Sequence, residues 1–141
     1  PRVAFSARNV ADNTDLGHHQ TLVFLHVNIN EGNCYHQTTG LFSPNIPGVY
    51  VFYFTIITAS DVEIRTTLVK DGTELSYSYA YGASSKYSQA GNMAIVHLNV
   101  GDNVWVEIET THPPAGTNIG TSENSFSGFL LYSYNQCSKA V

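Results

Sequence analysis

The stretch FLHVNINEGNCYHQTTGLFSPNIPGVYVFYF, residues 24–54, decides the fold of this chain. Its last part alternates strictly, so that Tyr50, Phe52, Phe54 and the following Ile56 share one face of an extended segment. Two valines and a tyrosine occupy the positions between them and form a second apolar face. Because both faces are apolar, the pattern predicts a central strand of a sheet.

The same alternation recurs on the C-terminal side of this stretch. Residues 62–68 alternate apolar and polar positions, and Asp71-Gly72 then supplies the positive backbone angles of a tight turn, which predicts a hairpin. Residues 94–100 place Val100 and three earlier apolar residues inward, Gly101-Asp102-Asn103 turns the chain, and residues 104–108 continue inward. We interpret this part as a second hairpin.

The last apolar run, from Phe126 to Tyr134, predicts an interior strand, and Gly128 within it indicates a bulge or a close approach of two backbones. No segment sustains helical spacing over three turns. The chain is therefore predicted to be all-β, with its strands arranged as a sandwich or a barrel.

Composition narrows the class of protein. The length of 141 residues fits one domain, which we assign to residues 1–141 with a core of about 3–134 and a short polar C-terminal tail. Only 12% of the residues are charged and 43% are hydrophobic, which predicts that a partner subunit covers part of the surface. A net charge of -5 without a basic cluster excludes nucleic-acid binding. No apolar run approaches the ~20 residues of a membrane-spanning helix.

Eight positions of the opening stretch resemble the signature of the globular head of complement C1q: Phe24, Asn30, Tyr35, Phe42, Gly48, Tyr50, Phe52 and Phe54. Four further segments are similar to the same family in the same order: residues 4–7, 68–72, 98–106 and 126–132. The resemblance implies a ten-stranded jelly-roll β-sandwich of the C1q/TNF type that assembles as a homotrimer. It also implies a secreted, extracellular protein, in which a collagen-like or coiled-coil stalk often precedes the head.

Catalysis is not expected. His18 and His19 are adjacent, so in a strand they would point to opposite faces, and His26 and His36 are separated by an Asn-rich loop. We interpret these histidines as exposed loop residues. The chain has no Gly-x-Ser-x-Gly motif, and we interpret Asp102, Glu107 and Glu109 as solvated strand-edge carboxylates. Neither an enzymatic activity nor a cofactor is predicted.

Calcium binding of the family type is not expected either. The resemblance implies two ligand aspartates near the Gln89-Ala90 segment, and these positions hold Ala80 and Ser88. Such residues offer at most a neutral hydroxyl to a hard cation. An unrelated weak site stays open, with three acidic residues as its candidate ligands: Asp12, Asp15 and Glu123.

A segment dense in tyrosine and small hydroxyl residues occupies the place of that site. Tyrosine offers an apolar ring and a hydrogen-bonding tip at low entropic cost, which suits sugar or protein recognition. The alternative interpretation is that these tyrosines line the trimer axis or an edge strand. The candidate ligand-binding residues are Tyr77, Tyr79, Tyr81, Lys86, Tyr87 and Gln89.

Structural roles are expected for the remaining prominent residues. Trp105 lies within a predicted strand and is interpreted as structural. Phenylalanines in predicted strands are assigned to the core or a subunit interface: Phe52, Phe54, Phe126 and Phe129. Cys34 and Cys137 form either a disulfide bridge, within or between subunits, or two free thiols.

The resemblance leads to a functional hypothesis of a secreted trimeric pattern-recognition protein of innate immunity. It would act like a lectin and bind carbohydrate or microbial surface molecules through loops at one end of the trimer. The alternative hypothesis is a receptor ligand or extracellular scaffold that binds a cell-surface protein.

Overall fold

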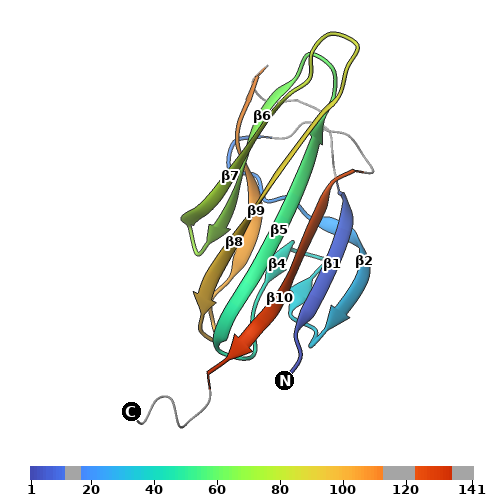
Figure 1. Ribbon diagram of the computed structural model, residues 1–141. Helices are drawn as coiled ribbons and strands as arrows, with labels where there is room; N and C mark the ends of the chain where they lie inside the picture. The colour runs from blue at the N-terminus through green and yellow to red at the C-terminus, as the bar shows by residue number, and fades with distance from the viewer. Residues whose placement is uncertain (12–16, 113–122, 135–141) are drawn as a thin grey trace.

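Ten antiparallel strands build the described part of the computed structural model, which comprises residues 1–11, 17–112 and 123–134 (Figure 1). They are β1 (Ala4–Val10), β2 (Phe24–Glu31), β3 (Tyr35–His36), β4 (Leu41–Phe42), β5 (Gly48–Thr58), β6 (Glu63–Lys70), β7 (Thr73–Tyr81), β8 (Ser88–Leu98), β9 (Val104–His112) and β10 (Ser125–Ser133). The prediction of an all-β chain is confirmed.

The strands form two five-stranded sheets packed face to face as a jelly-roll sandwich. One sheet has the order β2-β1-β10-β5-β8 and the other has the order β3-β4-β9-β6-β7. We call them the β5 sheet and the β6 sheet. Figure 1 shows β7 and β8, the edge strands of different sheets, running side by side, and the side-chain Nδ2 of Asn92 donates to the Tyr77 carbonyl across this seam at 2.9 Å. The sandwich is therefore closed along this side.

The central strand predicted from the opening stretch is β5, which lies between β10 and β8. Its inward face is fully buried at Tyr50, Phe52, Phe54 and Ile56. On the other face, Tyr53 is 49% exposed, so the described residues cover only about half of it. The inward prediction is confirmed, and the outward apolar face is left facing solvent.

Most of the eight signature positions prove to be core positions. The rings of Phe42 and Tyr50 are 5.4 Å apart, and those of Phe42 and Phe52 are 5.1 Å apart, so aromatic side chains from both sheets interlock. Asn30 does not lie in the core but brackets the β2–β3 turn, because its side chain accepts from the backbone N–H of Tyr35 and donates to the carbonyl of Tyr35. A side chain at Gly48 would collide with the Tyr132 carbonyl oxygen, which would lie 2.4 Å from its Cβ.

Tyr35 fastens β3 to β2 from within the core. Its buried hydroxyl accepts from the backbone N–H of Phe24 at 3.0 Å and donates to the Phe24 carbonyl at 2.7 Å. Desolvation by burial raises the pKa of Tyr35 from 10.0 to about 12, against the lowering effect of the Phe24 hydrogen bond. Burial, with a further contribution from Cys34, also raises the pKa of Tyr50 to about 12.

These two hydroxyls predict an alkaline loss of stability. Each folded-state pKa is raised, so the neutral phenol is the form that folding favours, and its contribution is fully present below pH 10 and lost as the pH rises through about 12. We expect Tyr35→Phe to be less stable by about 1 to 3 kcal/mol at neutral pH because the Phe24 groups lose a partner. Urea unfolding at increasing pH should show this difference narrowing towards pH 12. The exposed variant Tyr87→Phe is the control, and a constant gap between wild type and Tyr35→Phe would contradict the assignment.

The β6–β7 hairpin is confirmed at its turn. Asp71 has φ 47° and Gly72 has φ 88°, the two successive positive angles of a tight hairpin turn. The strands pair in antiparallel register from Lys70 and Thr73 to Glu63 and Tyr81.

The second predicted hairpin is wrong. β8 pairs with β5 in the β5 sheet, whereas β9 pairs with β4 and β6 in the other sheet. The turn at Gly101 therefore carries the chain from one layer to the other, and Val100 is 63% exposed rather than inward. Leu98 and Val104 do point inward, as predicted, because the inner faces of both sheets meet in one core. Alternation identifies the buried face of a strand but not the sheet that contains it.

The interior strand predicted near the C-terminus is β10, between β1 and β5. Gly128 marks a close approach, since a Cβ there would lie 2.5 Å from Phe52 Cδ1 and 2.8 Å from Phe5 Cε1. A register shift between Leu130 and Tyr132 supplies the bulge. The close approach at Gly128 is therefore made by aromatic rings rather than by a second backbone, and the bulge lies two residues further along the strand.

Candidate functional site

The two outer faces of the sandwich differ in chemistry. On the β5 sheet, three rows of paired residues place apolar side chains next to one another. In the first row Ala4 pairs with Phe129, Phe129 with Val51, and Val51 with Ile95. We define the apolar face by these exposed or half-buried side chains: Ile29, Val51, Tyr53, Met93, Ile95 and Phe129.

The apolar face is continuous across four strands. Tyr53 pairs with Met93, so the second row extends the first on β5 and β8, whereas the polar Ser127 interrupts it on β10. Towards the start of β5, Tyr132 pairs with Val49, and the ring of Tyr134 lies 4.9 Å from that of His97. Exposed apolar surface of this extent is typical of protein interfaces. It also accounts for the low charge content of the sequence.

The outer face of the β6 sheet carries the candidate tyrosines. Tyr77, Tyr79 and Tyr81 alternate with the inward Ser78 and Ala80 on β7, and the three rings are 41%, 54% and 54% exposed. We call these three residues the tyrosine strip. Since β7 is the edge strand of its sheet, the edge-strand interpretation describes where they lie, and their exposure leaves them available to a ligand.

Charged side chains from neighbouring strands lie alongside the tyrosine strip. Arg65 on β6 is placed over the Tyr77 ring, with its guanidinium carbon 4.7 Å from the ring centroid, and its Nε donates to Glu109 on β9 at 2.9 Å. The hydroxyl of Tyr77 donates to the carboxylate of Glu74. Desolvation, followed by the charge and hydrogen bond of Glu63, raises the pKa of the Tyr79 hydroxyl. The strip therefore has carboxylates along its length and an arginine that is already paired.

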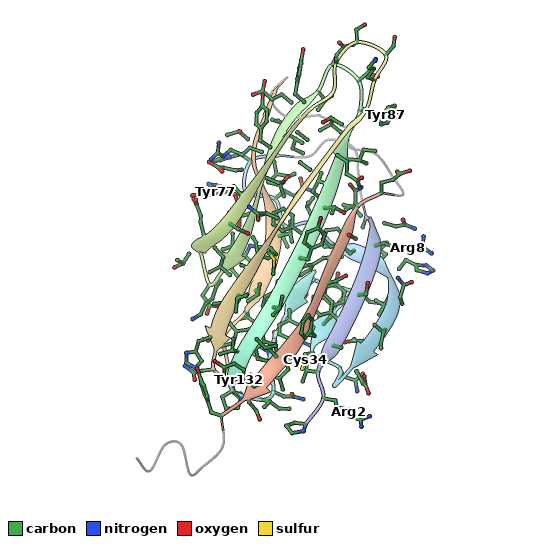
Figure 2. The ribbon with its side chains drawn as sticks, viewed as in Figure 1. Arg2, Arg8, Cys34, Tyr77, Tyr87 and Tyr132 are labelled. Atoms are coloured by element: carbon green, nitrogen blue, oxygen red, sulfur yellow. The ribbon has the colours of Figure 1, made fainter. Side chains whose placement is uncertain are left out.

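The other candidate residues are only partly brought together with the strip. Lys86 and Tyr87 lie in the connection between β7 and β8, where Tyr87 is 64% exposed, and Figure 2 shows Tyr87 near the opposite end of β7 from Tyr77. Gln89 lies on the outer face of the β5 sheet, and its side chain donates to the Glu123 carbonyl at 2.8 Å. The six residues thus extend from one outer face around the connection to the other.

The histidines serve local contacts. His18 and His19 are exposed outside the strands, as expected, and they contact the carbonyl of Glu109 and the carboxylate of Glu107 respectively. His26 and His36, in contrast, lie within β2 and β3 rather than in loops. The supposed Asn-rich loop is wrong in its position because Asn28 and Asn30 belong to β2. Pairing of β2 with β1 overrides the turn preference of asparagine there.

Glu107 connects two elements on the outer face of the β6 sheet. One of its oxygens is 2.7 Å from Nδ1 of His19, and the other accepts from the indole N–H of Trp105 at 2.8 Å. Trp105 pairs in register with the buried Val69. Trp105 is thus engaged by its own sheet rather than presented as an open platform.

Residues 1–11, 17–112 and 123–134 contain no cluster of three acidic, histidine or cysteine side chains that could hold a metal ion. Ala80, at the position where the resemblance implies a calcium ligand, points into the core, whereas Asp12 and Asp15 lie outside the described residues. We expect calcium chelation to leave the melting temperature nearly unchanged, because a ligand stabilises only a native state that binds it. Calorimetry with and without chelator tests this expectation, and a fall of several degrees on chelation would contradict it.

Cys34 is buried, and burial raises the pKa of its thiol, with a smaller lowering effect from a backbone contact at Asn45. It forms no disulfide bond within the described part of the chain, and Cys137 lies outside that part. Among the described residues, no helix has the length and hydrophobicity to span a bilayer.

Sequence reasoning missed the charged neighbours of the tyrosine strip. Glu63, Arg65 and Glu109 come from β6 and β9, and only the register of three strands brings them beside β7. The available signal was the alternation of Glu63 and Arg65 on the polar face of the predicted hairpin. Counting the hairpin register outward from Asp71-Gly72 would have paired Arg65 with Ser78, on the other face, because the register shift between Leu68 and Val69 that brings Arg65 to Tyr79 has no signal in the sequence.

Comparison with known proteins supports the fold and the family. The chain is 34% identical to rat (Rattus norvegicus) complement C1q tumor necrosis factor-related protein 5; the match covers 94% of this chain and 55% of that protein. The chain thus spans about half the length of the curated relative.

Two solved structures share the fold. The globular domain of zebrafish complement 1qA protein has a TM-score of 0.76 at 23% identity, with 94% of this chain and 99% of that chain covered. The Eiger TNF of S. frugiperda has a TM-score of 0.72 at 17% identity, with 96% of each chain covered. The sequence model of the C1q domain matches residues 4–131, and this chain therefore belongs to the C1q domain family.

Proposed function

We propose that this domain is a secreted, homotrimeric, non-enzymatic recognition module that binds carbohydrate or microbial surface molecules, as a pattern-recognition lectin of innate immunity does. The observation that carries the proposal is the difference in chemistry between the two outer faces of the sandwich. An apolar face on the β5 sheet is suited to self-association, and a tyrosine-bearing face on the β6 sheet is suited to a polar ligand.

Self-association is supported by the apolar face. Phe129, Ile95 and Met93 are each about half exposed in one chain, and burying apolar surface of this kind is favourable by roughly 25 cal/mol per Å². A three-fold arrangement buries one face of every protomer without leaving an open end. It also leaves the β6 sheet of each protomer outward.

Carbohydrate binding is supported by the tyrosine strip. Exposed tyrosine rings stack on the apolar faces of sugars, and their hydroxyls, together with Arg65, offer hydrogen bonds to sugar hydroxyls. A shallow surface of this kind gives weak binding at one site. Three sites on one trimer multiply that affinity by avidity.

The alternative is a receptor ligand or extracellular scaffold. Its support is the exposed strip itself, since tyrosine and arginine are also the residues that dominate protein–protein hot spots. The two functions differ in the class of molecule that binds at Tyr79, which is a glycan in the first and a protein in the second.

The test combines an assembly measurement with two binding screens. Light scattering should give a trimer, and a glycan array together with intact bacteria should show binding that Tyr79→Ala reduces about tenfold or more through the loss of three linked contacts. Val100→Ala, an exposed residue of the β8–β9 turn that is not part of the tyrosine strip, is the matched control. If neither glycans nor bacteria bind while a defined cell-surface protein does, the lectin proposal is lost and the alternative stands.

A further inference from the structure

The charge around the tyrosine strip narrows the class of ligand. The carboxylate of Glu74 contacts the Tyr77 hydroxyl, and the charge of Glu63 contributes to the raised pKa of Tyr79. Glu109 lies on β9, which is separated from β7 by β6. Arg65 is the cation that lies over the Tyr77 ring, and its Nε is committed to Glu109 at 2.9 Å. An anionic ligand at Tyr77 or Tyr79 would therefore meet carboxylates beside an arginine that is already paired.

Arg65 also shows what this surface accepts. Its guanidinium lies over one tyrosine ring while a carboxylate holds it from the side, a combination of cation–π attraction and an ion pair. Within the described ranges, no side-chain cation lies over the rings of Tyr79 or Tyr81. Glu63 is paired in register with Tyr81 and is next to Tyr79, so the two free rings have a carboxylate beside them.

The strip is long enough for several units of a polymer. Tyr77 and Tyr81 are four strand positions apart, which corresponds to about 13 Å along β7. The three rings stand in one line along the edge of a sheet, and among the described residues none covers them enough to reduce their exposure below 41%. This geometry suits a linear chain that lies along the strand.

We propose that the tyrosine strip binds a linear amine-bearing glycan, such as a glucosamine polymer, with an ammonium group held over Tyr79 or Tyr81 and paired with Glu63. This inference rests on the proposed carbohydrate-binding function and names its ligand class. The sugar faces stack on the rings, and the free amine supplies the positive charge that matches the carboxylates.

The test compares glucosamine oligomers of equal length in binding titrations with the assembled protein. We expect the fully deacetylated oligomer to bind about three- to tenfold more tightly than the N-acetylated one, and added salt to reduce that preference. Glu63→Gln keeps the shape of the surface and should abolish the preference without weakening the N-acetylated oligomer. Asp102→Asn, which removes a carboxylate from the β8–β9 turn outside both outer faces, is the matched control and should change neither affinity.

The outcomes separate this inference from the function on which it rests. Equal binding of the two oligomers, or a preference that survives Glu63→Gln, would overturn the amine assignment while glycan binding stands. Tighter binding of a sulfated oligosaccharide than of the deacetylated oligomer would also overturn the amine assignment while glycan binding stands. If no oligosaccharide binds but an oligolysine peptide does, and Glu63→Gln weakens it, the strip recognises a basic protein segment and the glycan inference is wrong.

Discussion

Phe129→Asp is expected to convert the assembled protein to protomers at micromolar concentration without unfolding them. The Phe129 ring is 45% exposed in one chain and lies between Ala4 and Val51 at the middle of the apolar face. In a trimer that buries this face, the substitution places three carboxylates where no partner charge is available, and each would lose hydration. The fold of one chain does not depend on this ring, because the side chain points away from the core.

Light scattering coupled to size exclusion measures the change, with circular dichroism to establish that the strands persist. Val100→Asp introduces the same charge at an exposed apolar residue of the β8–β9 turn and should leave the assembly intact. A Phe129→Asp protein that elutes like wild type would show that the apolar face is not the assembly surface. A stable lone protomer in the wild type would refute the trimer itself.

Phe126→Ala is expected to lower the free energy of unfolding by about 3 to 5 kcal/mol. Phe126 lies three residues before Phe129 on the same strand, but it points inward and is fully buried. Its ring lies 4.8 Å from that of Phe5 and 5.8 Å from that of Phe24, so its removal leaves a cavity that the surrounding rings cannot fill.

Chemical denaturation at several protein concentrations separates this effect from assembly, because the stability of an oligomer depends on concentration. Phe129→Ala is the matched variant: its stability loss should appear mainly as a weaker assembly, whereas that of Phe126→Ala should persist in the dissociated protomer. Equal losses in the two dissociated variants would contradict the opposite orientations of the two rings.

The strands with strong local signals were predictable from sequence. The alternation of residues 48–56 identified β5 and its buried face, and Asp71-Gly72 located the β6–β7 turn. The short strands β3 and β4 carry too few residues to show a period, and Asn28 lies in β2 despite a preference for turns. The partners of β8 and β9 were mispredicted because the choice of sheet depends on contacts distant in sequence.

The candidate site was predictable only in its aromatic part. Alternating tyrosines from Tyr77 to Tyr81 are visible in the sequence as a pattern of exposed rings on one strand face. The contacts of Arg65 with Tyr77 and with Glu109 depend on the register of β6, β7 and β9. Arg65 and Glu109 are 44 residues apart in the sequence, so their ion pair has no local signal. Gln89 is close to the tyrosines in sequence but is separated from the strip because β8 belongs to the other sheet.

The antiparallel pairing of β1 with β10 has a practical consequence for experiments on ligand capture. Leu130 donates its backbone N–H to the Val3 carbonyl, so the start of the first strand lies beside the closing part of the last. Figure 1 shows the N-terminus at the end of the sandwich remote from the β7–β8 connection. A biotin attached at Pro1 would therefore fix the protein to a sensor surface by its base and hold Tyr87 towards the flowing analyte.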